Sequence, residues 1–123
     1  MLTAIRNRNS LSPAIREMII LRVAVLNKAQ YEFDAHVPHA LQGGLTESKI
    51  EALKQITVGD AFSDQEQLIL SLTDVMTRDI RVPDILFEKI KPMFNDQEIL
   101  ELVATISAYN MVSRLLNALQ VGH

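Results

Sequence analysis

The chain has 123 residues with 48% hydrophobic and 22% charged residues, a net charge of −3 and no cysteine. This length and ordinary composition predict one folded domain over residues 1–123 and argue against disorder. The absence of cysteine excludes a disulfide framework, a thiolate metal site and a thiol nucleophile. The small acidic balance, without a run of Lys or Arg, argues against a nucleic-acid partner.

The N-terminal segment MLTAIRNRNS contains two arginines but lacks the apolar stretch of a signal peptide. The longest apolar run of the chain is interrupted by Arg22. No membrane span is therefore expected, and the sequence predicts a cytoplasmic protein without a membrane partner.

The first strong helix signal is Ser12 followed by Pro13. Ser12 is a good N-cap residue, and Pro13 would occupy the first helical position, where the backbone N–H has no partner within the helix and its absence costs nothing. We expect a helix from about residue 13 to 27. Residues 19–26 are rich in Ile and Val, so a buried strand is the competing interpretation, but the cap, the length and the Met, Leu and Ala favour a helix. Because this helix is apolar on every side, it should be either the central element or a subunit interface.

A second helix is predicted from about residue 29 to 42, ending at Gly43 and Gly44, where glycine can adopt a left-handed C-cap. Pro38 lies inside it and removes one backbone donor, so we expect a kink just after His36. Residues 12–45 thus form a predicted helical hairpin, which holds most of the chemically capable side chains.

Four further helices follow. Thr46 caps a third helix through about Thr57, with Ile50 and Leu53 on its buried face. Capping boxes open the fourth and sixth helices at residues 63–66 and 95–98, and the fifth lies between two prolines at 83 and 92. In the fourth helix the core positions are Leu68, Ile69, Leu72, Val75 and Met76, with Asp74 and Arg78 on the outer side. No alternating strand pattern occurs, so the sequence predicts an all-α bundle of six helices, the last ending near Leu119.

Glu32 and His36 are the smallest acid–base unit in the hairpin, because residues four apart share one helical face. Glu32 could accept a hydrogen bond from the imidazole and raise its basicity; the simpler alternative is a solvated surface ion pair. His39 follows three residues later, but Pro38 distorts this face and no HExxH motif is present, so no metal is expected. Tyr31 is more typical of a core aromatic residue with a hydrated hydroxyl.

Glu17 is the second candidate for acid–base chemistry. It lies on the face of the first helix that carries Ile20, Leu21 and Ala24, whereas Arg22 points elsewhere. Burial of this face would raise the pKa of Glu17 and make it a possible proton shuttle. The sequence alone favours the simpler interpretation that Glu17 is a first-turn acid favoured by the helix dipole.

The sixth helix carries a polar stripe of Asn110, Ser113, Arg114 and Asn117 beside Tyr109. An outer, solvated face is the default interpretation. The alternative is that Asn110 and Arg114 form the wall of a pocket and hold an anionic substrate.

Four segments in this order resemble the carboxymuconolactone decarboxylase and alkylhydroperoxidase D-like family over essentially the whole chain: REMIILRVAVLN, YEFDAHVPHAL, GGLTESKIEAL and AYNMVSRLLNAL. The resemblance implies an all-α fold, assembly into homotrimers or homohexamers, and an active site at the helical hairpin, often near a subunit boundary.

In redox members of that family, a glutamate on the first helix, a Cys-x-x-Cys pair and a histidine form a proton relay. By resemblance, Glu17 matches the glutamate and His36 the histidine, while the cysteine positions fall at Ala29 and Glu32. A thiol peroxidase mechanism is therefore excluded. The decarboxylase branch is the better match, because it also places a carboxylate four residues before the histidine.

The resemblance implies acid–base chemistry on a small lactone or carboxylate, with His36 as general acid or base, Glu32 orienting it and Glu17 as an auxiliary acid. Tyr31, His39, Asn110 and Arg114 are the candidate substrate-binding residues, Arg114 for the substrate carboxylate. No cofactor is expected. The alternative is a non-catalytic oligomeric binding or scaffold protein that retained the fold. The apolar surface of the first and sixth helices predicts an obligate homo-oligomer.

Overall fold

The computed structural model describes residues 11–121, and within this range the chain is all-helical. The helices are α2 (Pro13–Leu26), α3 (Gln30–Gln42), α4 (Glu47–Ala52), α5 (Asp64–Arg78), α6 (Asp84–Ile90) and α7 (Asp96–Ala118), with a 3₁₀ turn η1 at Gly59–Ala61. The described residues contain no strand, so the strand alternative for residues 19–26 is wrong. The predicted fold class, an all-α bundle of six helices, is confirmed.

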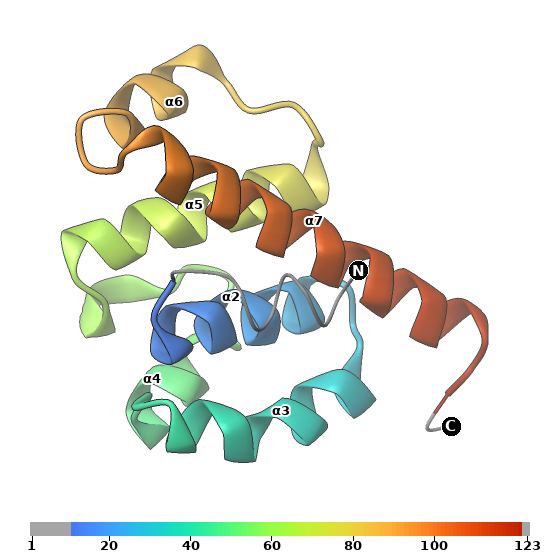
Figure 1. The fold of residues 1–123 in the computed structure, drawn as a ribbon. Coiled ribbons are helices and arrows are strands. Elements are labelled where there is room, and N and C mark those ends of the chain that lie inside the picture. Colours follow the sequence, from blue (N-terminus) through green and yellow to red (C-terminus); the bar gives the residue numbers. More distant parts are fainter. Residues whose placement is uncertain (1–10, 122–123) are drawn as a thin grey trace.

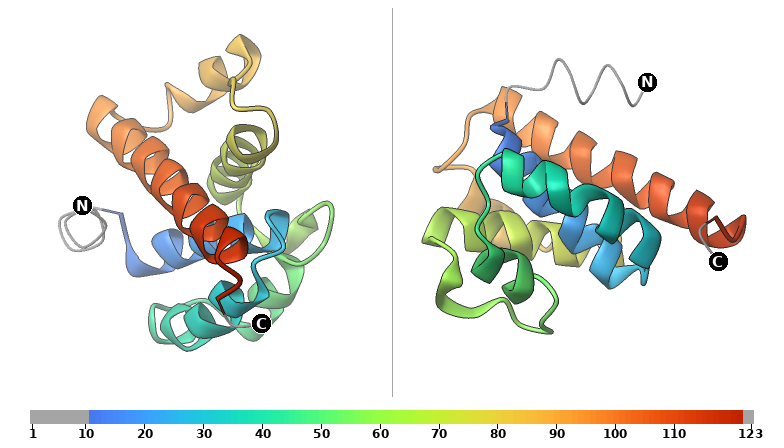
Figure 2. Two further views of the ribbon diagram at one scale, coloured as in Figure 1. Left: turned by 90° about the vertical axis from the view of Figure 1, so that its right-hand side faces the viewer. Right: turned by 90° about the horizontal axis from the view of Figure 1, so that it is seen from below.

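Helix α2 is the centre of the bundle. Figures 1 and 2 show it in the middle of the molecule, with α3 on one side and α5 and α7 on the other, and α2 contacts all three. Every residue from Glu17 to Ala24 is buried. The apolar character of α2 on all sides is therefore explained by three helical neighbours within the same chain.

The hairpin of α2 and α3 turns through Asn27, Lys28 and Ala29. Lys28 has a positive φ of 55° at this turn. At the other end of α3, the backbone N–H of Leu45 donates to the carbonyl of Ala40, and Gly44 has a φ of 110°, which only glycine adopts without strain. Helix α3 remains continuous through Pro38.

Helix α4 ends at Ala52, five residues earlier than predicted. The N–H groups of Lys54 and Gln55 donate to carbonyl oxygens three residues back, so the regular α-helical pattern stops there. The Arg22 guanidinium is fully buried and donates to the carbonyl oxygens of Leu53, Gln55 and Ile56. It also forms a two-pronged ion pair with Asp74 of α5, at 2.7 and 2.9 Å. The prediction that Asp74 lies on the outer side of its helix is therefore wrong.

Both capping boxes form as predicted, at Ser63 and Glu66 before α5 and at Asn95 and Glu98 before α7. By length and composition alone, α7 could cross a membrane. Its side chains Leu102, Thr105 and Ile106 are nevertheless completely buried in the bundle. A buried core helix meets the same criteria, so these two properties do not assign α7 to a membrane.

Candidate active site

Glu17 and His36 are brought together by the packing of α2 on α3. The Nδ1 atom of His36 lies 2.8 Å from Oε1 of Glu17, and the side chains are only 17% and 4% exposed. When Nδ1–H donates to this carboxylate, the imidazole is fixed in the tautomer that leaves Nε2 able to accept a proton. The pair thus has the arrangement of an oriented general base.

The Glu17 carboxylate is not a first-turn acid, since α2 begins at Pro13 and its first turn contains no acidic residue. Its second oxygen lies 3.6 Å from Nε of Arg16. The preferred interpretation from the sequence is therefore wrong, and the alternative of a buried carboxylate is the observed one. Only the packing of α3 on α2 reveals its partner.

This pair forms part of the wall of a cavity of about 340 Å³. The cavity is lined by Pro13, Arg16, Glu17, His36, His39, Gln42 and Gly43. The His39 ring centroid lies 5.6 Å from that of His36, and the ring of Tyr109 approaches His36 edge-on at 5.9 Å. The volume suits a small molecule, and one arginine, two histidines and a carboxylate converge on it.

Glu32 does not orient His36, because the hydrogen-bonding position on Nδ1 is held by Glu17. The Glu32 side chain is buried, with a residue exposure of 3%, and neither carboxylate oxygen has a hydrogen-bond partner among the described residues. Both the predicted hydrogen bond to His36 and the alternative of a solvated surface ion pair are therefore wrong.

Burial raises the pKa of Glu32 to about 7, because desolvation disfavours the charged carboxylate, and His36 partly offsets this effect through its charge. Such a carboxyl group gains and loses a proton near neutral pH. Perturbed groups of this kind are concentrated at functional sites, although structural sites also contain them.

Glu32 and Tyr31 line a different cavity, of about 480 Å³, between the start of α3 and the end of α7. Leu116, Asn117 and Val121 form the side of this cavity that belongs to α7 and the residues after it. Tyr31 is 53% exposed, so the prediction of a core aromatic residue is wrong. The predicted site is thus divided, with Glu17, His36 and His39 in one cavity and Glu32 and Tyr31 in the other.

Asn110 and Arg114 belong to a hydrogen-bonded network that joins α7 to the hairpin turn. The amide of Asn110 donates to Thr77 and to the carbonyl of Ile106, and its oxygen accepts from Asn27 and Arg114. Asn110 is buried and lines neither cavity described above, so the interpretation as an outer, solvated face is wrong for it. Its hydrogen-bonding groups are all occupied within the protein.

Comparison with known proteins identifies the family. The sequence profile described as the carboxymuconolactone decarboxylase family matches residues 1–74, more than half of the chain. The chain belongs to the carboxymuconolactone decarboxylase family. An uncharacterized protein of Bacillus subtilis (strain 168), YdfG, is 28% identical over 110 residues, which cover 88% of this chain and 75% of that protein.

Two solved structures are similar in fold. A protein of unknown function from Agrobacterium tumefaciens, suggested to be the antioxidant defence protein AhpD, matches with a TM-score of 0.89 and 24% identity, over 99% of this chain and 84% of that one. An uncharacterized peroxidase-related protein from Silicibacter sp. TM1040 matches with a TM-score of 0.83 and 25% identity, over 94% and 64%. This member of the carboxymuconolactone decarboxylase family has no cysteine.

Sequence reasoning missed Arg16, which lies in the wall of the His36 cavity. Its position next to Glu17 is the only signal in the sequence, and one arginine beside a glutamate is too common to be informative. Within residues 11–121, no group of three or more His, Asp or Glu side chains is arranged as metal ligands.

Proposed function

We propose that this protein is a carboxymuconolactone decarboxylase-like enzyme that performs acid–base chemistry on a small lactone or carboxylate. The observation that supports this proposal is the 2.8 Å contact between His36 and Glu17 at the wall of a cavity. In this reaction, Nε2 of His36 removes or returns a proton next to a carbonyl group, while Glu17 holds the ring and stabilises the imidazolium.

Arg16 replaces Arg114 in this proposal as the residue that binds a substrate carboxylate, because it lines the same cavity as His36. A guanidinium pairs with a carboxylate through two parallel hydrogen bonds and so fixes its orientation. His39 contributes a polar contact at the cavity wall, whereas Glu32 lines the other cavity and has no role in this step. Thiol peroxide reduction is not proposed, because the chain has no cysteine.

The test uses small unsaturated lactone carboxylates, dicarboxylates and hydroxy acids. We expect at least one to raise the melting temperature of the wild type, since a ligand at a hundredfold excess over its Kd stabilises the native state by about 2.7 kcal/mol. Its hydrogens next to the carbonyl should exchange with D₂O, as followed by NMR. His36→Ala and Glu17→Gln should abolish the exchange, while Lys89→Met, at an exposed site on α6, should not change it.

Ligand binding without hydrogen exchange or turnover would instead support a non-catalytic binding or scaffold protein. Exchange that persists in both His36→Ala and Glu17→Gln would contradict the assignment of this pair as the acid–base group.

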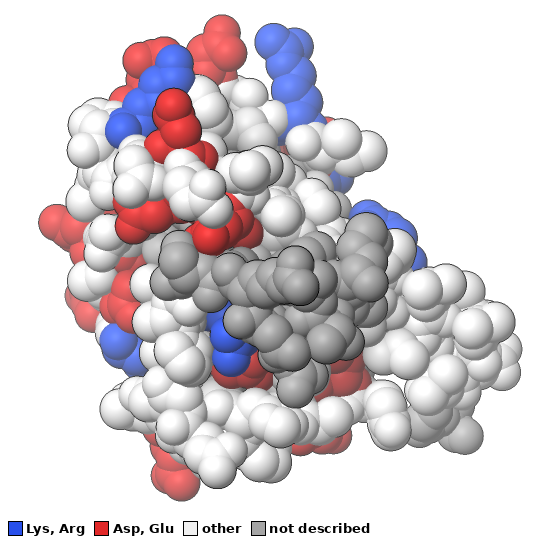
Figure 3. Space-filling view, in the orientation of Figure 1, with Lys and Arg blue, Asp and Glu red and all other residues white. Residues whose placement is uncertain are grey.

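We also propose that the protein is a homotrimer or homohexamer and acts in the cytoplasm. The support for an oligomer is a stripe of exposed apolar residues at four-residue spacing on α7 and at its C-cap, namely Met111, Leu115 and Leu119, with exposures of 38%, 52% and 72%. Figure 3 shows that the end of α7 presents a largely uncharged surface at the right of the molecule. Apolar stripes of this kind on a helix are typical of subunit contacts.

The expected result is a mass of three or six chains by light scattering at micromolar concentration. Leu115→Glu should lower that mass, because a charge in the contact would be desolvated, whereas Ile85→Glu, at a still more exposed site on α6, should not. A wild type that remains monomeric would contradict the proposal.

A further inference from the structure

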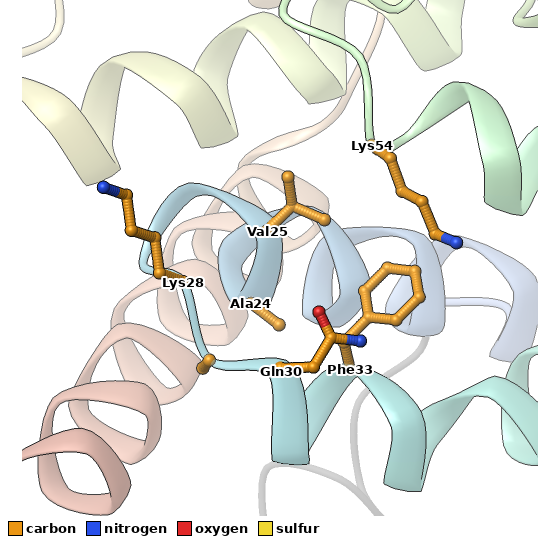
Figure 4. Close-up of a pocket in the computed structure, with 7 residues that line it drawn as sticks. Ala24, Val25, Lys28, Gln30, Phe33 and Lys54 are labelled. Atoms are coloured by element: carbon orange, nitrogen blue, oxygen red, sulfur yellow. The ribbon is translucent and has the colours of Figure 1, made fainter.

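A third cavity, of about 350 Å³, lies at the turn of the hairpin. It shares Lys28, Ala29 and Gln30 with the Glu32 cavity but no lining residue with the His36 cavity. It is lined by Ala24, Val25, Lys28, Ala29, Gln30, Phe33 and Lys54. These residues come from the end of α2, the turn, the first half of α3 and the residues after α4 (Figure 4).

The lining combines an apolar floor with positive charge at the rim. Ala24, Ala29 and Phe33 are buried and provide the apolar part. Lys28 and Lys54 stand on opposite sides of the cavity in Figure 4, and no Asp or Glu is among the lining residues, although the whole chain has a net charge of −3. This arrangement is complementary to an anion with an apolar body and not to a cation or a sugar.

Lys54 is available to a ligand. Its ammonium lies 5.4 Å from the centroid of the Phe33 ring and 3.0 Å from a Glu51 carboxylate oxygen. The Lys54 and Glu51 side chains are 44% and 69% exposed, and an ion pair so accessible to solvent contributes little free energy. A ligand carboxylate at the Phe33 ring can therefore replace Glu51 as its partner.

The start of α3 lies at one end of the cavity. Its N-cap, Ala29, has no side chain that could cap the helix, so the first-turn N–H groups have no such acceptor, and the helix dipole directs its positive end here. Lys28 precedes this end and Gln30 begins the helix. The first turn of α3 also contains Glu32, which lines the neighbouring cavity, so the positive charge at this cavity comes from the two lysines.

We propose that this cavity binds a small aromatic or branched organic carboxylate. The apolar body of the ligand packs on Phe33, Ala24 and Ala29, and its carboxylate pairs with Lys54, while Lys28 supplies attraction from the opposite rim. This site is separate from the acid–base site of the proposed function, and its occupation requires neither His36 nor Glu17.

The test is a titration of ¹⁵N-labelled full-length protein with benzoate, with neutral benzamide of the same shape and with inorganic phosphate. Benzoate should shift the backbone amides of residues 24–33, benzamide should bind at least tenfold more weakly, and phosphate should not saturate these shifts. Lys54→Met should weaken benzoate binding about tenfold or more, the loss typical of one charge-assisted contact. Lys28→Met should weaken it about threefold.

Lys89→Met, at an exposed lysine on α6, should leave benzoate binding unchanged, and so should His36→Ala. Retained binding in His36→Ala together with loss of hydrogen exchange separates this site from the proposed acid–base site. Val25→Phe, which fills the cavity and keeps both lysines, should abolish binding. Equal binding of benzoate and benzamide, or shifts confined to residues that line the His36 cavity, would overturn the proposal.

Discussion

Arg22→Met should lower the free energy of unfolding by about 3–5 kcal/mol, the range seen when one partner of a buried ion pair is removed. Arg22 is completely buried, and its five N–H donors are all used, two on Asp74 and three on carbonyl oxygens after α4. Methionine fills similar space but leaves a carboxylate and three carbonyl groups without these donors. Urea unfolding at pH 7 and one fixed protein concentration measures the loss.

Arg78→Met is the matched control, because Arg78 is exposed on the same helix as Asp74, one turn later. That substitution should change the free energy of unfolding by no more than about 0.5 kcal/mol. Arg22→Lys should also be destabilising, since an ammonium has three donors and cannot pair with a carboxylate in two-pronged geometry. An Arg22→Met protein within 1 kcal/mol of the wild type would show that the network does not hold α4, α5 and α2 together.

Glu32→Gln should make the protein less sensitive to rising pH. In the wild type we expect the free energy of unfolding to fall as the pH rises, and the variant should lack this fall. The folded protein holds the pKa of Glu32 near 7, above its ordinary value of 4.5, through burial. Between these two values the native state binds more protons than the unfolded state, so the free energy of unfolding falls as the pH rises through this window. Below pH 4.5 both states are protonated, and above pH 7 the full penalty applies.

The penalty is on the order of 2 kcal/mol at pH 8, with allowance for solvent screening. Chemical denaturation of the wild type and Glu32→Gln at pH values from 4 to 8 should therefore give two curves that separate with increasing pH, the variant becoming relatively more stable. Glu88→Gln removes a carboxylate that is 70% exposed and should leave the wild-type curve unchanged. Parallel curves for the wild type and Glu32→Gln would contradict the raised pKa.

The sequence predicted those features that are encoded by residues close together in the chain. The Ser12–Pro13 start of α2, both capping boxes and the stop at Gly43 and Gly44 depend on contacts within a few residues, and all appear in the structure. The end of α4 was placed too late, and the residues that follow it bind Arg22, which lies about thirty residues upstream. Local propensity carries no information about such a partner.

In the candidate site, too, the sequence predicted what depends on nearby residues and missed what depends on packing. The sequence by itself determined that the hairpin carries Glu17, Glu32 and His36 and that thiol chemistry is impossible, since residue identity and helical spacing are local properties. Only the tertiary structure decided that Glu17 rather than Glu32 pairs with His36, and that Glu32 is buried without a hydrogen-bond partner among residues 11–121. Both outcomes depend on how α2, α3 and α7 face one another, and burial and pairing of a carboxylate arise from that packing and not from its neighbours in the sequence.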